Sequence, residues 1–327
     1  MWHLLNCAVQ GRGHVSVGIP CQDKTLTYQD KEISLIALAD GAGSAHLSHF
    51  GAECVVQSIK ELMTSEFDRI YMTEDGVSIK QELLAYLNKR LLELSNEYKC
   101  EIQELASTLL FVVIKGEKYV LAHLGDGVIG YQKDGELKIA TEPNNGEFVN
   151  ETVFVTSRSA LHSIKMLRGS LNGITGFVLM SDGTENSFYD KKNKRLAKGI
   201  SKIMKLSMLM PRDVVERVVD KAFESTIKMN TTDDCSLALM VWAKDGEEYG
   251  ALTVEEKIEI LGLGARTKAE QVAKYDLILA ELKKNISLER ICDKMRIKKS
   301  HLHRYINRMS AVGILENRNG TYYVNVK

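Results

Sequence analysis

The sequence ISLIALADG, residues 33–41, decides the fold expected for this chain. Ile33 to Ala39 are almost all apolar, and a run of this length suits a strand that is buried on both faces. The run ends directly on Asp40 and Gly41, a pair typical of turns. A carboxylate at this position can face a ligand, while the glycine lets the backbone approach it closely. The sequence therefore predicts a central strand with a candidate site at its end.

The same junction of an apolar strand and a turn recurs three times. Asp126 lies in the sequence LGDG and Asp182 in MSDG, while Asp233 precedes the apolar run 235–242. Each Asp-Gly pair taken singly is most often a plain turn. Several carboxylates brought together would repel one another unless a cation compensates their charge. Because oxygen ligands suit hard ions such as Mg²⁺ and Mn²⁺, the set predicts a metal centre.

The order of apolar runs predicts an α+β fold, a central antiparallel β-sandwich flanked by helices. Short links, among them an Asp-Gly pair at residues 134–135, join neighbouring strands as hairpins. We expect helices over 48–64, 195–207 and 212–228 and along the leucine stripe between residues 83 and 94, with Ser48 capping the first. The expected strands cover residues 2–10, 33–39, 107–114, 118–123, 128–132, 137–140, 177–180 and 235–242.

An ordered series of motifs gives the chain a more specific likeness. The motifs are Gln22-Asp23, then DGAGS at 40–44, LGDG at 124–127, SDG at 181–183 and TDDCS at 232–236. This series resembles that of the PPM, or type 2C, family of metal-dependent phosphatases. The segment from Gly13-His14 to Asp23 is similar to a bacterial branch of that family. The resemblance implies a two-sheet sandwich with a dinuclear Mn²⁺ or Mg²⁺ centre at one end.

The resemblance also implies roles for individual residues. Asp40 would bridge two ions, Asp126 would help to hold a third, weaker ion, and Asp23 would act through a bound water. Asp40, Asp182 and Asp233 would be the catalytic carboxylates. A metal-bridging water or hydroxide would attack the phosphorus of phosphoserine or phosphothreonine in a protein substrate. The full implied ligand set is Asp40, Gly41, Asp182, Asp233, Asp126 and Asp23.

Three positions depart from the family pattern. Gln22 stands where many members have a carboxylate, and Gly18 stands where many have an arginine for the substrate phosphate. Ala42 replaces a histidine that some members carry, although bacterial members commonly lack it. His14 or Arg12 could take over the substrate phosphate, while a solvated loop position is the alternative for both. The departures favour a competing hypothesis, a DNA-binding regulator whose phosphatase-like domain is catalytically silent and senses a ligand.

The C-terminal part has a pattern of its own. Residues 254–327 carry a net charge of +6, so residues 1–253 carry −6. Three helical stripes and an Asn-Gly hairpin at 314–324 resemble a small winged helix-turn-helix domain. We expect a catalytic domain at 1–247, a connecting helix at 248–267 and this domain at 268–327. A basic face would bind DNA or a protein partner, two alternatives that stay open. Its candidate residues are Lys299, His303, Arg304, Arg308 and Arg318.

The remaining composition indicates where the protein acts. The N-terminus lacks the basic start and apolar run of a signal peptide, and no apolar stretch has the length of a membrane span. The 6 cysteines are scattered with no CxxC pair, which favours free thiols over disulfides or zinc ligands. We therefore expect a cytoplasmic enzyme that acts on a phosphorylated protein and does not bind a membrane.

Overall fold

The computed structural model describes residues 1–143, 152–244 and 248–326. They divide into two compact units. The first unit comprises Trp2–Ser201 and Asp220–Trp242, and the second comprises Met1, Lys202–Val219 and Ala243–Lys327. Residues 202–219 thus group with the C-terminal residues, although the sequence had placed them in the first domain. The domain limits at 247 and 267 remain predictions.

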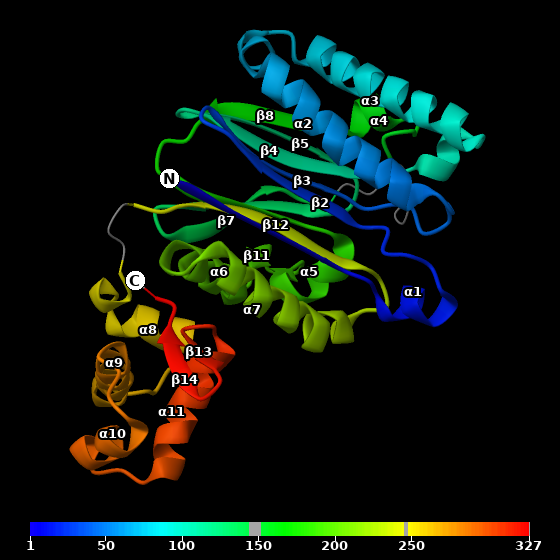
Figure 1. Cartoon of the computed structure of the whole chain (residues 1–327). Coiled ribbons are helices and arrows are strands. Elements are labelled where there is room, and N and C mark those ends of the chain that lie inside the picture. The colour runs from blue at the N-terminus through cyan, green and yellow to red at the C-terminus, as the bar shows by residue number, and fades with distance from the viewer. Residues whose placement is uncertain (144–151, 245–247, 327) are drawn as a thin grey trace. The chain divides into compact units, whose positions relative to one another are not determined.

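Two five-stranded antiparallel sheets form the first unit (Figure 1). One has the order β1-β12-β9-β6-β7, and the other has the order β2-β3-β4-β5-β8. The first sheet consists of Trp2–Val9, Cys235–Trp242, Ile174–Met180, Val128–Lys133 and Glu136–Thr141. The second consists of Lys24–Gln29, Ile33–Ala39, Leu109–Lys115, Lys118–Leu124 and Lys165–Ser170. The predicted antiparallel α+β fold is confirmed.

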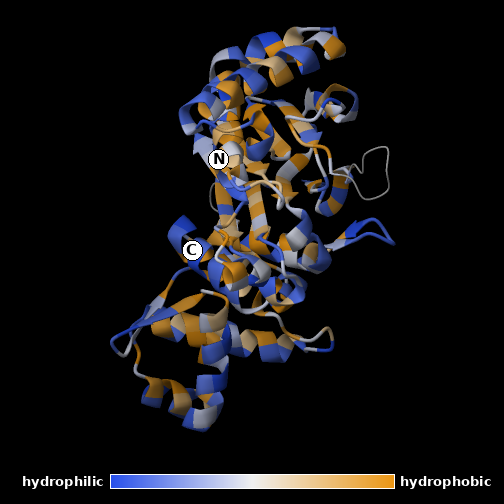
Figure 2. Ribbon diagram, turned by 90° about the vertical axis from the view of Figure 1, so that its right-hand side faces the viewer, coloured by the Kyte–Doolittle hydropathy of each residue, from blue (hydrophilic) through white to orange (hydrophobic). Residues whose placement is uncertain are grey.

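Strand β3 is buried along its whole length because both of its faces are covered. Ile36 and Leu38 pack into a cluster shared by the two sheets, together with Phe177 of β9. Leu35 and Ala37 lie in a second cluster with the helices α2 (Ser48–Met72) and α3 (Gly76–Tyr98). Figure 1 shows these helices over the second sheet, and the strands are mostly orange in the hydropathy colouring of Figure 2.

The smaller elements of the first unit account for most differences from the predicted segments. The structure adds α1 (Arg12–Val17), strands β2 and β8, and α5 (Asp182–Phe188). It also contains η1 (Ile102–Leu105), α4 (Ala160–Ser163) and η2 (Ile227–Asn230). The helix expected from residue 195 begins later, as α6 (Lys198–Leu209), because Arg195–Leu196 pair as β11 with Tyr189–Asp190 of β10. Helix α7 spans Arg212–Ser225.

The start of α2 differs from the prediction in its chemistry. The N-cap position is Leu47, which makes no side-chain cap, and Ser48 is the first helical residue. Ser48 is fully buried, and its hydroxyl accepts a hydrogen bond of 2.6 Å from the side-chain amide of Gln22. The predicted capping role of Ser48 is therefore wrong. Instead of capping the helix, the hydroxyl of Ser48 holds the segment of Gln22, which leads into β2.

The second unit contains η3 (Tyr249–Ala251), four helices and a hairpin besides residues 202–219. The hairpin of Leu315–Arg318 (β13) and Thr321–Val324 (β14) turns at Asn319 and Gly320, which both have positive φ as an Asn-Gly turn requires. Ser287 caps α10 by accepting a hydrogen bond from the backbone N–H of Arg290. The helices are α8 (Val254–Leu261), α9 (Ala269–Lys283), α10 (Leu288–Met295) and α11 (Lys299–Ala311).

Residues 202–219 pack closely against the C-terminal residues of their unit. A Cβ added to Gly313, which has φ +77°, would lie 2.7 Å from the side chain of Val218. Arg217 is 3.4 Å from a carboxylate oxygen of Glu316, and Lys205 is 2.7 Å from Glu259. The likeness of the three helices and hairpin to a winged helix stays a prediction. No helix in the described ranges has both the length and the apolarity for a membrane crossing.

Candidate metal centre

Asp40 is fixed by the strand that pairs with β3. Its backbone N–H donates to the hydroxyl of Thr108 at 2.8 Å, and its carbonyl accepts the N–H of Thr108 at 2.8 Å. Gly41 then forms an isolated bridge with Ser107. A Cβ on Gly41 would lie 2.8 Å from the hydroxyl oxygen of Ser48, so only glycine fits at this point. The end of β3 is therefore held rigidly in the position where the carboxylate is needed.

Asp126 lies between β5 and β6, in a loop that two glycines allow. Gly125 has φ +117°, and a Cβ there would lie 2.5 Å from a methyl carbon of Thr108. Thr152 donates its hydroxyl hydrogen to one carboxylate oxygen of Asp126. The loop is thus packed against the same threonine that holds Asp40.

Asp182 is the first residue of α5, directly after β9. The carbonyl of Ser236 accepts hydrogen bonds from the N–H of Ser181 and the hydroxyl of Thr184, which ties the start of α5 to β12. A Cβ on Gly183 would lie only 2.0 Å from the carbonyl oxygen of Asp234. The close passage of α5 past the start of β12 therefore requires glycine at position 183.

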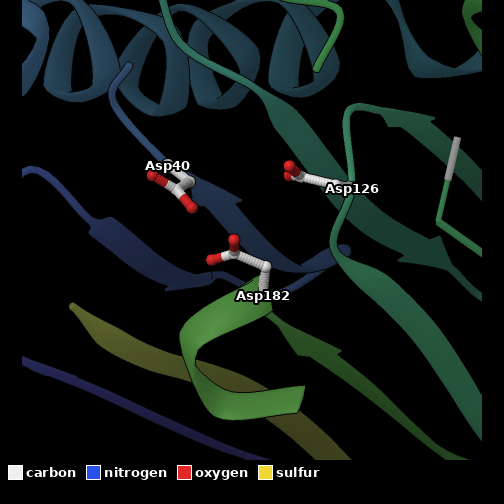
Figure 3. A group of neighbouring side chains, drawn as sticks. All are labelled: Asp40, Asp126 and Asp182. Atoms are coloured by element: carbon white, nitrogen blue, oxygen red, sulfur yellow. The ribbon is translucent and has the colours of Figure 1, made fainter. Parts of the chain in front are cut away.

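Three of the predicted carboxylates converge at one end of the sandwich. Asp40, Asp126 and Asp182 each offer an oxygen, and these oxygens lie within 4.8 Å of one another (Figure 3). Burial raises the pKa of Asp182 to about 6, and the negative charges of Asp126 and Asp233 add to the shift. Burial also raises the pKa of Asp40 well above its ordinary value, with Asp23 and Asp182 adding to it. A bound divalent cation would offset both the burial of these charges and their mutual repulsion, so the donor set fits Mn²⁺ or Mg²⁺.

Asp233 occupies a different position from the three converging residues. Its side chain is 50% exposed, and one of its oxygens accepts the N–H of Asp234 at 2.8 Å. Its charge still raises the pKa of Asp40 and of Asp182. Asp233 therefore lies at the open side of the cluster, and its role as a ligand, like that of the Gly41 carbonyl, remains a prediction.

Asp234 fastens three chain segments with one buried side chain. One oxygen accepts the N–H of Gly11 at 2.6 Å, and the other accepts the N–H of Gln22 at 2.6 Å. The first oxygen also lies 2.9 Å from Nδ1 of His14. Asp234 is 2% exposed, so these contacts are sheltered from water. It therefore positions the backbone around the cluster.

Arg12 and His14, the predicted phosphate-binding residues, contact the segment that carries Asp233. The guanidinium of Arg12 donates to the carbonyls of Thr231 and Met229 at 3.1–3.2 Å. His14 has Nε2 3.9 Å from an oxygen of Asp233 in addition to its approach to Asp234. These contacts orient the segment that carries Asp233. A contact of either residue with a substrate phosphate stays a prediction.

Gln22 stands where many family members have a carboxylate, and its side-chain amide forms hydrogen bonds that hold the local structure. The amide nitrogen donates to the carbonyl of Ala45 at 3.2 Å and to the hydroxyl of Ser48 at 2.6 Å. The side chain therefore secures the start of α2. The departure at Gln22 does not remove a carboxylate from the converging group.

Asp23 is a buried carboxylate beside the cluster. It is 1% exposed, and neither oxygen has a hydrogen bond of good geometry within the described residues. Burial raises the pKa of Asp23 to about 7, although the nearby hydroxyls of Ser236 and Ser181 act in the opposite direction. Such an under-satisfied carboxylate fits the predicted contact with a metal-bound water.

The raised pKa of Asp23 predicts a pH-dependent effect on the metal-free protein. The folded state binds this proton more tightly than the unfolded state, whose pKa is near 3.8. The stability of the folded state therefore falls as pH rises from about 4 to about 7. We expect Asp23→Asn to raise the melting temperature in EDTA strongly at pH 8 and less at pH 5. Asp293→Asn, on an exposed part of α10, is the control and should change neither value; an equal gain at both pH values for Asp23→Asn would contradict this interpretation.

A buried carboxylate that the sequence analysis missed lies one helical turn after Asp182. Glu185 is 2% exposed, and its Oε2 lies 2.7 Å from Nζ of Lys191 in the β10–β11 loop. Burial raises the pKa of Glu185, and the charge of Lys191 opposes this shift. The spacing of Asp182 and Glu185 would have indicated one helical face, but no helix was expected at 182–188.

The predicted basic residues of the C-terminal part fall into two groups. Lys299 lies 3.2 Å from a carboxylate oxygen of Glu289, and Arg318 lies 2.9 Å from one of Glu316. Nδ1 of His303 lies 2.8 Å from the backbone carbonyl of Lys299. Arg308 donates to the carbonyl of Gly262 at 2.6 Å, and Arg304 lies beside it along one groove. Their binding to a partner stays a prediction.

Two stacked antiparallel sheets, helices outside them and a carboxylate cluster at the strand ends define the class of metal-dependent phosphatases. The family model described as protein phosphatase 2C matches residues 10–219. The chain therefore belongs to the protein phosphatase 2C family, and the predicted family and enzyme class are confirmed. The competing hypothesis of a silent regulator is not favoured.

Individual relatives agree with this assignment. The chain is 21% identical over 257 residues to serine/threonine-protein phosphatase 3 of Escherichia coli K12, covering 74% of this chain and 99% of the relative. Two solved structures share the fold at 14% identity and cover 75% of the chain. One is a bacterial serine phosphatase, with a TM-score of 0.54 and 100% of its chain covered. The other is Stp1 of Staphylococcus aureus, with a TM-score of 0.52 and 96% covered.

A further structural relative holds metal ions. The catalytic domain of the serine/threonine phosphatase PstP was crystallised in complex with two manganese ions. It has a TM-score of 0.50 and 16% identity, with 75% of this chain and 100% of that chain covered. At identities this low, the three structures show a likeness of fold alone.

Proposed function

We propose that this chain removes phosphate from phosphoserine and phosphothreonine in a protein, using Mn²⁺ or Mg²⁺. The observation that carries the proposal is the convergence of Asp40, Asp126 and Asp182 within 4.8 Å. These carboxylates would hold the ions, with Asp233 and the Gly41 carbonyl completing the set and Asp23 acting through a water. The manganese ions of the related PstP domain support the choice of metal.

Each group of residues has a distinct part in this reaction. When bound, the ions supply Lewis acidity that activates water and neutralises the phosphoryl oxygens. Asp40 and Asp182 hold their negative charge for the ions at a buried position, where electrostatic interactions are stronger than in water. Thr108, Gly41 and Gly183 fix the backbone that carries these side chains. Asp234 keeps the segment of Gln22 against that of Asp233.

The direct test is phosphate release from phosphothreonine and phosphoserine peptides. Purified full-length protein is incubated with MnCl₂, with MgCl₂ or with EDTA. We expect turnover with either metal and none with EDTA. Absence of metal-dependent turnover by protein that is folded, as judged by circular dichroism, would contradict the proposal.

Lys191 is the cation that we assign to the anionic substrate. Glu185, which holds its ammonium group at 2.7 Å, lies on α5 one turn after Asp182. The pKa of Lys191 is raised first by its hydrogen bond with Glu185 and further by the charges of Asp182 and Asp126. Its side chain is 68% exposed. Lys191 is therefore close to the cluster and accessible to a phosphoprotein.

Removal of this cation should affect binding more than chemistry. Because an exposed ion pair contributes roughly 1 kcal/mol, we expect Lys191→Ala to raise KM for a phosphothreonine peptide about fivefold with little change in kcat. Lys191→Arg should retain most of the affinity. Lys89→Ala, which removes the same charge from the exposed surface of α3, serves as the control. A KM for Lys191→Ala equal to that of the control would rule out this role.

A further inference from the structure

A groove in the second unit brings several basic side chains together. It has a volume of about 980 Å³ and is lined by residues of α6, α8, α9 and α11 and of the loops after α8 and α10. All of its lining residues belong to the second unit. Among the described residues, the charged residues that line it are all basic: Lys202, Lys274, His301, Arg304 and Arg308.

Two of these cations meet where the chain leaves α8. A Cβ on Gly262 would lie 3.4 Å from Nζ of Lys202 and 3.9 Å from Nη1 of Arg308. Burial lowers the pKa of Lys202, and the charge of Arg308 lowers it further. Arg308 itself is held by the carbonyl of Gly262 at 2.6 Å. Because like charges at this separation repel, an anion bound between them would be stabilised.

Three carboxylates of the second unit form ion pairs with cations that do not line the groove. Glu259 of α8 lies 2.7 Å from Nζ of Lys205, and its charge also opposes the lowering of the Lys202 pKa. On the other surfaces of the domain, Lys299 is beside Glu289 and Arg318 is beside Glu316. Lys299 and Arg318 are therefore compensated, whereas no carboxylate in the described part of the chain forms an ion pair with Lys202, Lys274, Arg304 or Arg308.

The rest of the lining is apolar and aromatic. Leu261, Leu263, Ile297 and Val312 contribute side chains, and Tyr305 lines the groove with its ring packed edge-on against that of Tyr275 at 4.8 Å. A bare inorganic anion would leave these apolar walls in contact with water. An apolar surface with a few convergent charged groups, at this volume, is the usual character of a small-molecule site.

We propose that this groove binds a phosphate-bearing organic anion of the nucleotide class. Lys202, Lys274, Arg304 and Arg308 would contact the phosphates, and Tyr305 with the apolar side chains would contact the organic part. The site is separate from the carboxylate cluster and does not depend on the phosphatase reaction.

Calorimetric titration of the full-length protein tests the proposal. The protein is kept in EDTA so that no metal-bound phosphate site contributes, and the probes are ATP, inorganic tripolyphosphate and a short DNA duplex. We expect saturable binding of ATP, weaker binding of tripolyphosphate, and a Kd for ATP raised at least tenfold in Lys274→Ala/Arg304→Ala, because charge-assisted hydrogen bonds contribute about 1.5–3 kcal/mol each.

The control is Lys299→Ala/Arg318→Ala, which removes two charges from the same unit outside the groove. It should bind ATP as the wild type does, and both double variants should keep the wild-type melting temperature. Absence of saturable ATP binding would overturn the proposal, as would equal weakening by the two double variants or tripolyphosphate binding as tight as that of ATP. Duplex binding that is tighter than ATP binding and is lost in Lys299→Ala/Arg318→Ala would assign this surface to DNA instead.

Discussion

Asp40→Asn is expected to lower Mn²⁺-dependent hydrolysis of a phosphothreonine peptide by more than about 100-fold, and Asp182→Asn should have a similar effect. Loss of groups that merely orient a metal ligand already costs about 10–100-fold, and these two carboxylates would be ligands themselves. Both are buried beside further carboxylates, so a neutral amide removes charge at the point where the ions need it. The measurement is kcat/KM at saturating MnCl₂, with calorimetric titration of Mn²⁺ into the metal-free protein.

The two variants should fold at least as well as the wild type without metal. In the metal-free wild type the pKa values of Asp40 and Asp182 are raised, so their charged forms destabilise the folded state at neutral pH. A neutral amide at either position removes this destabilisation. We therefore expect unchanged or higher melting temperatures in EDTA alongside the loss of activity. Asp293→Asn is the matched control and should be fully active. Variants that retain activity within a few-fold of the control would exclude Asp40 and Asp182 as essential ligands.

The sequence predicted the central features of the first unit because they are local. The continuous apolar run 33–39 could only be a strand covered on both sides, and Ile36 and Leu35 are indeed buried on opposite faces. The Asp-Gly pairs marked strand ends, and antiparallel pairing brought three of these ends together. The strand-end positions suggested that these carboxylates could converge, and the resemblance of the motif series implied the same group; the structure brings Asp40, Asp126 and Asp182 together.

The sequence was less informative where contacts are distant along the chain. It implied that Asp126 holds only a third, weaker ion, and the structure places Asp126 in the converging group, while the ligand role of Asp233 stays a prediction. It treated Gln22 as a weakened acidic position, although its amide binds the start of α2. It missed β2, which has polar residues at several positions and is ordered by pairing with β3. These outcomes depend on partners that no local pattern reveals.

The neighbours Asp233 and Asp234 should separate metal binding from folding. Asp234→Ala would leave the N–H groups of Gly11 and Gln22 without an acceptor at a site that is 2% exposed. Since an unsatisfied buried donor costs about 1–3 kcal/mol, the variant should lose roughly 2–5 kcal/mol of unfolding free energy. Asp233 is half exposed, and Asp233→Ala should change stability by about 1 kcal/mol or less.

Urea unfolding in EDTA measures the loss of unfolding free energy in Asp234→Ala without any contribution from bound ions. Titration of the activity with Mn²⁺ measures metal affinity, and Asp233→Ala should require a higher Mn²⁺ concentration for half-maximal rate. A crossed result, with stability lost in Asp234→Ala and metal affinity lost in Asp233→Ala, is the expected outcome. Equal stability of the two variants in EDTA would show that the three segments are held together without Asp234. In that case the short distances around its carboxylate would contribute little free energy, and the segment of Asp233 would be positioned by other contacts, such as those of Arg12 and the hydrogen bond from the N–H of Gly13 to the carbonyl of Thr232.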